Sequence, residues 1–224
     1  MPKLKLPDRD FKWTRKLAYA VGLITTDGNL SKNGRSINFT SKDKSLVDSF
    51  RKCLNLKNKI GRKNSGSCSW KKYFFIQFGN VVFYRWLQRI GLTPNKSKTI
   101  ANLKIPDKYF CDFLRGHLDG DGDINAYRDY YNTFKNPKYI YKRIFTRFRS
   151  ASKPHVEWLR TKIHKILSIR GHLNKEIRFR PNQISIMWIL KFAKKDSIKL
   201  LSWLYYSSNI PCLMRKRKIA EKFI

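Results

Sequence analysis

The sequence has 224 residues, and its 49 lysines and arginines against 15 aspartates and glutamates give a net charge of +34. This excess predicts a polyanionic partner, while the 42% hydrophobic and 14% aromatic content excludes a disordered basic tail, because such a chain can bury a core. The four cysteines are isolated, which argues against a zinc finger or a disulfide framework, and no segment resembles a secretory leader or a membrane span. We therefore expect a soluble, intracellular protein with no membrane partner.

The first hundred residues alternate between helical and strand-like patterns. Apolar residues at helical spacing predict a helix over 11–27, which Gly28 and Asn29 end, and alternating polar and apolar residues predict a strand over 35–40. The same criteria predict a helix over 44–54, strands over 57–63 and 72–78 with a turn at 64–67, and a helix over 80–90.

After a connector that contains Pro94 and Pro106, the same order of elements restarts. The elements predicted there are a helix over 108–121, a strand over 142–150, a helix over 154–167, strands over 172–180 and 183–190, and helices over 196–206 and 213–223. Gly22 and Gly116 lie 94 residues apart, as do Asp27 and Asp121. This internal repeat predicts two similar units, residues 1–103 and 104–224.

The two repeated helix ends read AVGLITTDG over residues 20–28 and LRGHLDGDG over residues 114–122. Small residues on a helix face let two backbones approach closely, so we expect these helices to cross at Gly22 and Gly116. Their ends would then bring Asp27 and Asp121 together. Two carboxylates at the negative ends of two helix dipoles repel each other unless a cation lies between them, and oxygen ligands suit a magnesium-like ion. The pattern therefore predicts a divalent metal site.

Both segments resemble the LAGLIDADG motif, and the chain resembles a single-chain LAGLIDADG homing endonuclease over nearly its whole length. The resemblance implies an α+β fold of two pseudo-symmetric αββαββα units, with the motif helices packed at the centre and two antiparallel sheets forming a DNA-binding saddle. It also implies site-specific cleavage of double-stranded DNA by a monomer, leaving short 3′ overhangs. Mg²⁺, or another divalent cation such as Mn²⁺, would be held by Asp27 and Asp121 and by the backbone carbonyls of Thr26 and Gly120. The reaction expected is metal-assisted phosphodiester hydrolysis.

The second motif departs from the family pattern at Arg115 and His117, which replace apolar residues, and Thr25 stands where the first motif would carry its first acid. None of these changes removes an expected metal ligand. Asp119 and Asp123 flank Asp121, but residues two apart on a helix point in different directions, so we expect them to have interface and turn roles.

A basic residue often stands at the end of the second strand of each half in this family. Lys42 matches that place, as a catalytic residue or as a phosphate anchor. The corresponding residue of the second half is Ala151, which leaves Lys98 or Lys153 as substitutes.

Strand alternation predicts which side chains contact DNA, because one face of each strand must pack on the helices. The predicted DNA contacts are Ser36, Asn38, Thr40, Tyr73, Gln77, Arg143, Arg147, Arg149, Asn174, Glu176, Arg178, Arg180, Gln183 and Ser185. Arg suits guanine and Asn or Gln suits adenine, although a phosphate contact or a solvated strand face fits each single position equally well. We further expect the segment 129–141 to extend a hairpin along the DNA backbone and residues 215–218 to face phosphates.

Two other functions fit the same fold. An intron RNA maturase would use the basic surface to bind its host intron RNA, and a non-catalytic DNA-binding regulator would keep the fold without cleavage. A regulator of this kind usually loses the motif acids, whereas Asp27 and Asp121 are both present. Their presence favours the nuclease over the regulator and leaves a maturase role open.

Overall fold

The computed structural model describes residues 11–65, 68–180 and 183–224. The first half contains α1 (Arg15–Asp27), β1 (Gly28–Leu30), β2 (Ser36–Ser41), α2 (Lys44–Cys53), β3 (Gly61–Ser65), β4 (Cys68–Gly79) and α3 (Val81–Arg89). The second half contains α4 (Asp107–Gly120), β5 (Asp123–Asp129), β6 (Tyr141–Ser150), α5 (Lys153–Leu167), β7 (His172–Arg180), β8 (Gln183–Phe192) and α6 (Lys194–Leu204), and α7 (Met214–Ala220) follows it. Both halves therefore run αββαββα, which confirms the predicted fold class.

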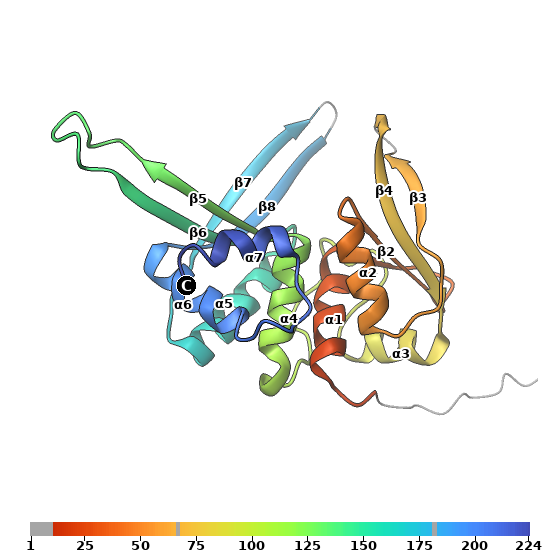
Figure 1. The fold of residues 1–224 in the computed structure, drawn as a ribbon. Helices are drawn as coiled ribbons and strands as arrows, with labels where there is room; N and C mark the ends of the chain where they lie inside the picture. The colour runs from red at the N-terminus through yellow and green to blue at the C-terminus, as the bar shows by residue number, and fades with distance from the viewer. Residues whose placement is uncertain (1–10, 66–67, 181–182) are drawn as a thin grey trace, which may run out of the picture.

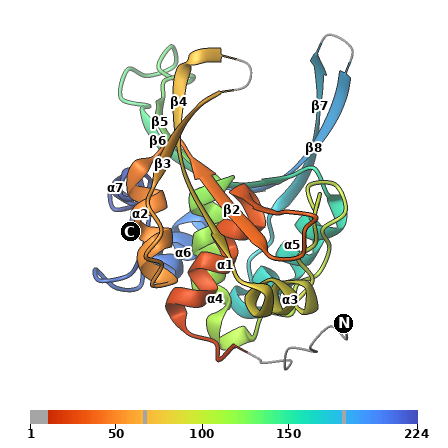
Figure 2. The ribbon, with the colours of Figure 1, turned by 90° about the vertical axis from the view of Figure 1, so that its right-hand side faces the viewer.

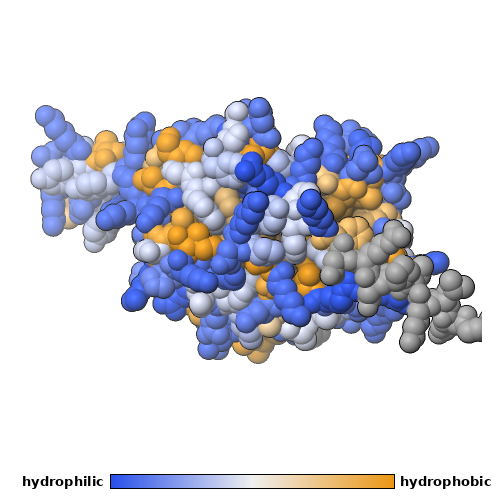
Figure 3. All heavy atoms as spheres, turned by 90° about the horizontal axis from the view of Figure 1, so that it is seen from below, coloured by the Kyte–Doolittle hydropathy of each residue, from blue (hydrophilic) through white to orange (hydrophobic). Residues whose placement is uncertain are grey.

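Each half forms its own four-stranded antiparallel sheet, with the orders β1-β2-β4-β3 and β5-β6-β8-β7. The two orders correspond strand by strand, as a duplicated unit requires. The β3–β4 and β7–β8 hairpins rise on the same side of the molecule, and the helices lie below them (Figures 1 and 2). Seen from below, the helical side is mainly hydrophilic, with small, scattered apolar areas (Figure 3). No helix among the described residues combines the length and the apolar character needed to cross a bilayer.

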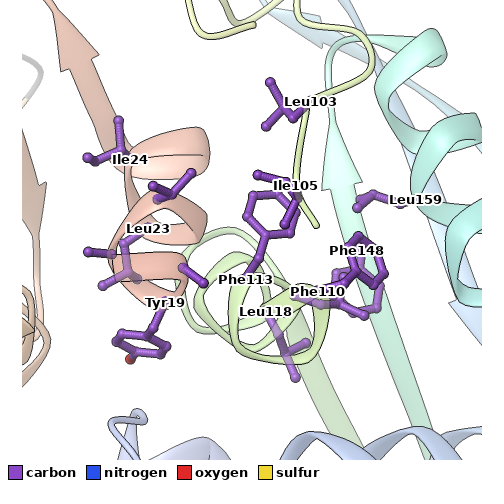
Figure 4. Close-up of a cluster of buried hydrophobic side chains, with 14 of the residues drawn as sticks. Tyr19, Leu23, Ile24, Leu103, Ile105, Phe110, Phe113, Leu118, Phe148 and Leu159 are labelled. Atoms are coloured by element: carbon purple, nitrogen blue, oxygen red, sulfur yellow. The ribbon is translucent and has the colours of Figure 1, made fainter. Parts of the chain in front are cut away.

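The motif helices α1 and α4 pack against each other at the centre of the molecule (Figure 1). A Cβ atom added at Gly22 would overlap the carbonyl oxygen of Phe113, and one added at Gly116 would overlap that of Tyr19. The crossing predicted from the two glycines is therefore present. Tyr19, Leu23 and Ile24 of α1 lie in one buried cluster with side chains of α4, the connector and the second sheet (Figure 4).

Replacing Gly22 with alanine is expected to lower the free energy of unfolding by about 3 kcal/mol or more, because the new methyl group would collide with backbone that cannot move aside cheaply. Urea titration measures the loss. Gly79→Ala is the matched control, since a Cβ atom there meets no atom within 4 Å. Equal stability of the two variants would contradict the close helix crossing.

Alternation along the strands places the predicted apolar residues inward. Ile37, Phe39, Ile76 and Phe78 are buried, and Phe74 is partly buried against the same core. The outward face carries the polar residues between them, and Asn38 lies directly opposite Gln77 in the β2–β4 register.

Several elements differ from the sequence-based prediction, and β4 for example begins at Cys68 rather than at residue 72. The first helix begins at Arg15 rather than at residue 11, because the Thr14 side chain caps it by accepting the Leu17 N–H at 3.1 Å. The strand β3 begins at Gly61 rather than at residue 57. The strand β5 was not predicted, since only Ile124 and Ala126 of DINAYRD alternate with polar residues, and it forms because β6 pairs with it along its whole length.

Candidate active site

The C-terminal ends of α1 and α4 bring Asp27 and Asp121 to the same place. A Cβ atom added at Gly120 would overlap the Thr26 side chain and would lie 3.1 Å from Asp27 Oδ2. Burial and then the charge of Asp121 raise the pKa of Asp27 to about 7. The Asp121 side chain keeps contact with solvent, yet the protein around it displaces enough water to raise its pKa as well. The two carboxyl groups therefore share one site in which the ionised form of each is disfavoured.

Two buried lysines bind the backbone at the ends of the motif helices. Lys216 Nζ donates to the carbonyl oxygens of Leu118 at 2.6 Å, Asp119 at 2.9 Å and Gly122 at 2.6 Å. Lys96 Nζ donates to the carbonyl oxygen of Gly28, the counterpart of Gly122 in the repeat. An ammonium group is favourable at a helix C-terminus, where the helix dipole is negative.

Burial lowers the pKa of each lysine to about 8, and the neighbouring carboxylates oppose that effect. The sequence-based interpretation missed Lys96, and it was wrong in placing Lys216 on a phosphate-facing surface. The two lysines lie 120 residues apart rather than 94, so the repeat gives no signal for the pair.

Two pockets flank the paired carboxylates. The first is lined by Asp27, Thr40, Ser41, Lys42, Asp43, Tyr73, Asp119, Gly120, Asp121 and Arg215. The second is lined by Thr25, Thr26, Ser97, Ile100, His117, Asp121, Arg149, Ser150, Ala151, His155 and Met187. Asp119 and Gly120 in the first pocket are the repeat counterparts of Thr25 and Thr26 in the second. The pockets are therefore pseudo-symmetric equivalents, one beneath each sheet.

The pockets differ in their basic residues. Lys42 and Arg215 line the first pocket, where Lys42 Nζ lies 5.7 Å from the centre of the Tyr73 ring and Arg215 pairs with Asp43 at 3.0 Å. Ala151 occupies the corresponding place in the second pocket, where Arg149 supplies the positive charge and works against the raised pKa of Asp121. Lys98 and Lys153, the two lysines suggested as substitutes, do not line this pocket. Lys98 is exposed, and Lys153 lies over the Trp188 ring.

The donor set fits a hard divalent cation that completes its coordination with water and phosphate oxygens. Among the described residues, no group of three or more His, Cys, Asp or Glu side chains is arranged to hold a metal ion. Mg²⁺ commonly binds one or two carboxylates together with substrate phosphates. Burial raises the pKa of both Asp27 and Asp121, and the nearby Lys96 and Lys216 lower each pKa only in part.

The polar departures in the second motif have structural partners. Arg115 is fully buried and donates to Asp112 at 2.5 Å and to the carbonyl oxygens of Leu204 and Pro211. Asp119, also buried, accepts from the Tyr19 hydroxyl at 2.8 Å and so joins the two motif helices. Asp123 is instead paired with Arg147 at 2.6 Å.

His117 and His155 form a buried pair beside the second pocket, with their Nε2 atoms 3.1 Å apart. Burial lowers the pKa of both rings, that of His155 to about 4. Lys96 lowers the pKa of His155 further, and Lys216 does the same for His117. Both rings are therefore neutral in the folded protein at neutral pH.

Because the pKa of His155 falls on folding, the unfolded chain binds more protons than the folded one between about pH 4 and pH 6.5. The contribution of His155 to the free energy of unfolding is greatest above pH 6.5. It falls by about 3 kcal/mol as the pH is lowered through this window. Urea unfolding of the wild type and His155→Gln across this range isolates the effect, since the glutamine does not titrate there. A difference between the two proteins that stays constant with pH would contradict it.

The predicted DNA contacts of the first half lie on the outward face of β2 and β4. Ser36, Asn38, Thr40 and Tyr73 are partly exposed, and Gln77 is exposed. The Thr40 hydroxyl donates to Asn38 Oδ1 at 2.8 Å.

In the second half, Arg143, Arg147 and Arg149 share one face of β6 and are paired with Asp129 or Asp123. Asn174 is exposed, and Glu176 and Ser185 are partly exposed. The side chains of Arg178, Arg180 and Gln183 lie outside the described residues.

No protein-family model matches the sequence, and no curated protein matches it. Solved structures match nearly the whole chain. Mesophilic variants of the homing endonuclease I-DmoI are 18% identical, with 92% of this chain and 97% of that chain covered and a TM-score of 0.55. The meganuclease I-SmaMI bound to uncleaveable DNA is 13% identical, with coverages of 97% and 89% and a TM-score of 0.62.

A full-length DUF199/WhiA protein from Thermatoga maritima is also similar, at 15% identity and a TM-score of 0.53. This chain covers 97% of its own length and 63% of that protein. Identities this low show the fold and not the activity. The chain thus has the fold found in LAGLIDADG homing endonucleases.

Proposed function

We propose that the chain is a homing endonuclease that binds one long duplex DNA site and cuts both strands with a divalent cation at Asp27 and Asp121. The observation that carries the proposal is the meeting of two carboxyl groups with raised pKa values at the ends of the crossed motif helices. Structures with the same fold have been solved with target DNA bound. The high positive charge matches a duplex partner.

Two pockets suit a reaction that cuts two strands. Each half, residues 1–103 and 104–224, contributes one motif acid and one sheet, and each pocket lies beneath one sheet. One scissile phosphate would occupy each pocket, and the offset between the cuts would leave short 3′ overhangs. Since one chain holds both motif acids, the proposed enzyme acts as a monomer.

The residues of the site would have two roles, metal binding and phosphate binding. Asp27 and Asp121, with the carbonyl oxygens of Thr26 and Gly120, would hold the cation. A bound divalent cation stabilises charge on the phosphate and lowers the pKa of an attacking water. Lys42 in one pocket and Arg149 in the other would hold a phosphate in place and offset its charge.

Lys96 and Lys216 would have a positioning role. Each fixes the backbone that follows a motif aspartate, and each lowers the repulsion between the carboxylates by its own charge. Neither is a metal ligand, because an ammonium group has no lone pair.

The outward sheet faces would read the target. Asn38, Gln77 and the arginines of β6 have side chains that recognise base edges or phosphates. Asp129 pairs with Arg143 at 3.0 Å and Asp123 with Arg147 at 2.6 Å, which would restrict the positions of these two arginines before DNA binds.

Incubation of the protein with a randomised duplex library and Mg²⁺ or Mn²⁺, followed by sequencing of the cut ends, tests the proposal. We expect double-strand cuts that recur at one long sequence, with a constant short 3′ overhang. If the protein binds one duplex tightly but does not cut it with any divalent cation, the nuclease proposal fails and the regulator is supported.

The non-catalytic DNA-binding regulator is the second candidate, because the fold also occurs in a DUF199/WhiA protein, whose name does not describe a nuclease. Both motif aspartates are present here at the ends of the crossed helices, which favours the enzyme.

A further inference from the structure

The hairpin between β5 and β6 sets the second half apart from the first. Residues 31–35 connect β1 to β2, whereas residues 130–140 connect β5 to β6. The longer loop lies at the far end of a hairpin that extends away from the helices (Figure 1). We call residues 127–141 the hairpin lobe.

The hairpin lobe exposes aromatic rings that its own fold does not bury. Tyr131 and Phe134 are 80% and 74% exposed, and their ring centres lie 6.3 Å apart in an edge-on arrangement. The other exposed aromatic residues of the lobe are Tyr127, Tyr130, Tyr139 and Tyr141. Contiguous exposed apolar surface on a soluble protein commonly marks a binding site.

Cations lie next to these rings. Lys135 Nζ is 5.6 Å from the centre of the Phe134 ring, and Arg143 Cζ is 5.4 Å from that of Tyr141. Lys138 is exposed in the same loop. Asp129 is the only acidic residue of the lobe, and it is occupied by Arg143 and by the Tyr131 N–H. The surface therefore combines flat rings with net positive charge.

This combination fits unpaired nucleotides better than a duplex. Duplex bases are stacked on one another, so a duplex offers its phosphates and base edges to a protein but not the flat faces on which aromatic rings stack. Unpaired bases stack on aromatic side chains while lysines follow the backbone, and each stacked base contributes substantially to affinity. RNA is the nucleic acid that commonly presents unpaired bases, in loops and bulges.

From these contacts we infer that the hairpin lobe binds unpaired nucleotides of single-stranded RNA, with bases stacked on Tyr131 and Phe134 and phosphates bound by Lys135 and Lys138. The site is separate from the two pockets at the motif helices. It requires no cleavage, so it stands or falls independently of the proposed nuclease function.

Fluorescence anisotropy of a short, unstructured, labelled RNA with the full chain, in EDTA, tests the inference. Removing both rings in Tyr131→Ser/Phe134→Ser should weaken RNA binding about tenfold or more, because stacking is lost. Phe179→Ser is the matched control, since Phe179 is 76% exposed on β7 outside the lobe, and it should leave RNA binding unchanged. The mutated rings make no core contacts, so the fold should survive, which circular dichroism checks.

Two further readouts separate stacking from charge. Lys135→Ser/Lys138→Ser should reduce the salt dependence of RNA binding, whereas the ring variant should keep it. Duplex DNA affinity should be unchanged in the ring variant.

Several outcomes would overturn the inference. An equal loss of duplex affinity would make the lobe part of the duplex surface. Tighter binding of single-stranded DNA of the same sequence would assign the site to a DNA strand. No loss of RNA affinity in the ring variant, or ring-dependent binding to anionic lipid vesicles instead of RNA, would refute base stacking.

Discussion

Replacing Asp27 with asparagine is expected to abolish cleavage and, in the absence of metal, to make the protein more stable. The expected loss of activity is at least about a thousandfold, because the amide no longer carries the negative charge that would hold a cation against the phosphates. Duplex binding should persist, since the outward faces of the sheets are untouched. Cleavage and binding assays on a selected target, with Mg²⁺ and with EDTA respectively, measure the two effects.

The gain in stability follows from the raised pKa of Asp27. Its carboxyl group has a pKa of about 7 in the folded protein and an ordinary value of 3.8 when unfolded, so the folded state binds the extra proton between these values. Stability from this group is therefore lost as the pH rises through the window, and the full cost above pH 7 corresponds to about 4 kcal/mol.

Asparagine cannot ionise, so Asp27→Asn should recover part of this cost, about 1 to 3 kcal/mol at pH 8 and little at pH 4. Recovery is incomplete because Lys96 and Lys216 lose a favourable charge at the same time. Asp121→Asn should change stability in the same direction. Urea titrations in EDTA at both pH values check the prediction. If Asp27→Asn is less stable than the wild type at pH 8, the ionised carboxylate of Asp27 does not destabilise the folded protein, and the prediction is wrong.

Local patterns in the sequence were enough to predict the two motif helices and the inward faces of the strands. The role of Gly22 and Gly116 could be predicted because a close helix crossing needs residues without side chains. The burial of Ile37 and Phe39 could be predicted because apolar and polar residues alternate along a strand with one buried face. The strand β5 is polar and depends on pairing with β6, so propensity alone did not reveal it.

The lysines of the site could not be predicted for a different reason. Lys96 reaches a carbonyl 68 residues away, and Lys216 reaches carbonyls 94 to 98 residues away. Neither contact leaves a spacing pattern, because the lengths of the intervening loops set the sequence separation and the folded backbone sets the meeting point. The sequence also did not reveal that Arg149, rather than a residue at the place of Ala151, supplies the positive charge of the second pocket. Only the structure shows which side chains line that pocket.

The asymmetry of the two pockets predicts that each DNA strand depends on a different basic residue. Lys42 lines one pocket, together with Arg215, which is paired with Asp43, and Arg149 lines the other. We expect Lys42→Met to slow the cutting of one strand by about tenfold to a hundredfold and Arg149→Met to slow the other, because each pocket would lose a positive charge next to its own phosphate. In both variants, a nicked duplex should accumulate before the double-strand break.

A target with a different fluorescent label on each strand follows the two cuts separately during single-turnover cleavage. Lys98→Met is the matched control, because Lys98 is an exposed lysine that lines neither pocket, and both of its strand rates should equal those of the wild type. Arg149 also pairs with Asp123 at 3.4 Å, so Arg149→Lys distinguishes the two roles. A retained charge should restore part of the strand rate even where the ion pair is weakened. Equal slowing of both strands by Lys42→Met would show that the pockets do not act separately, and the assignment of one phosphate to each pocket would fail.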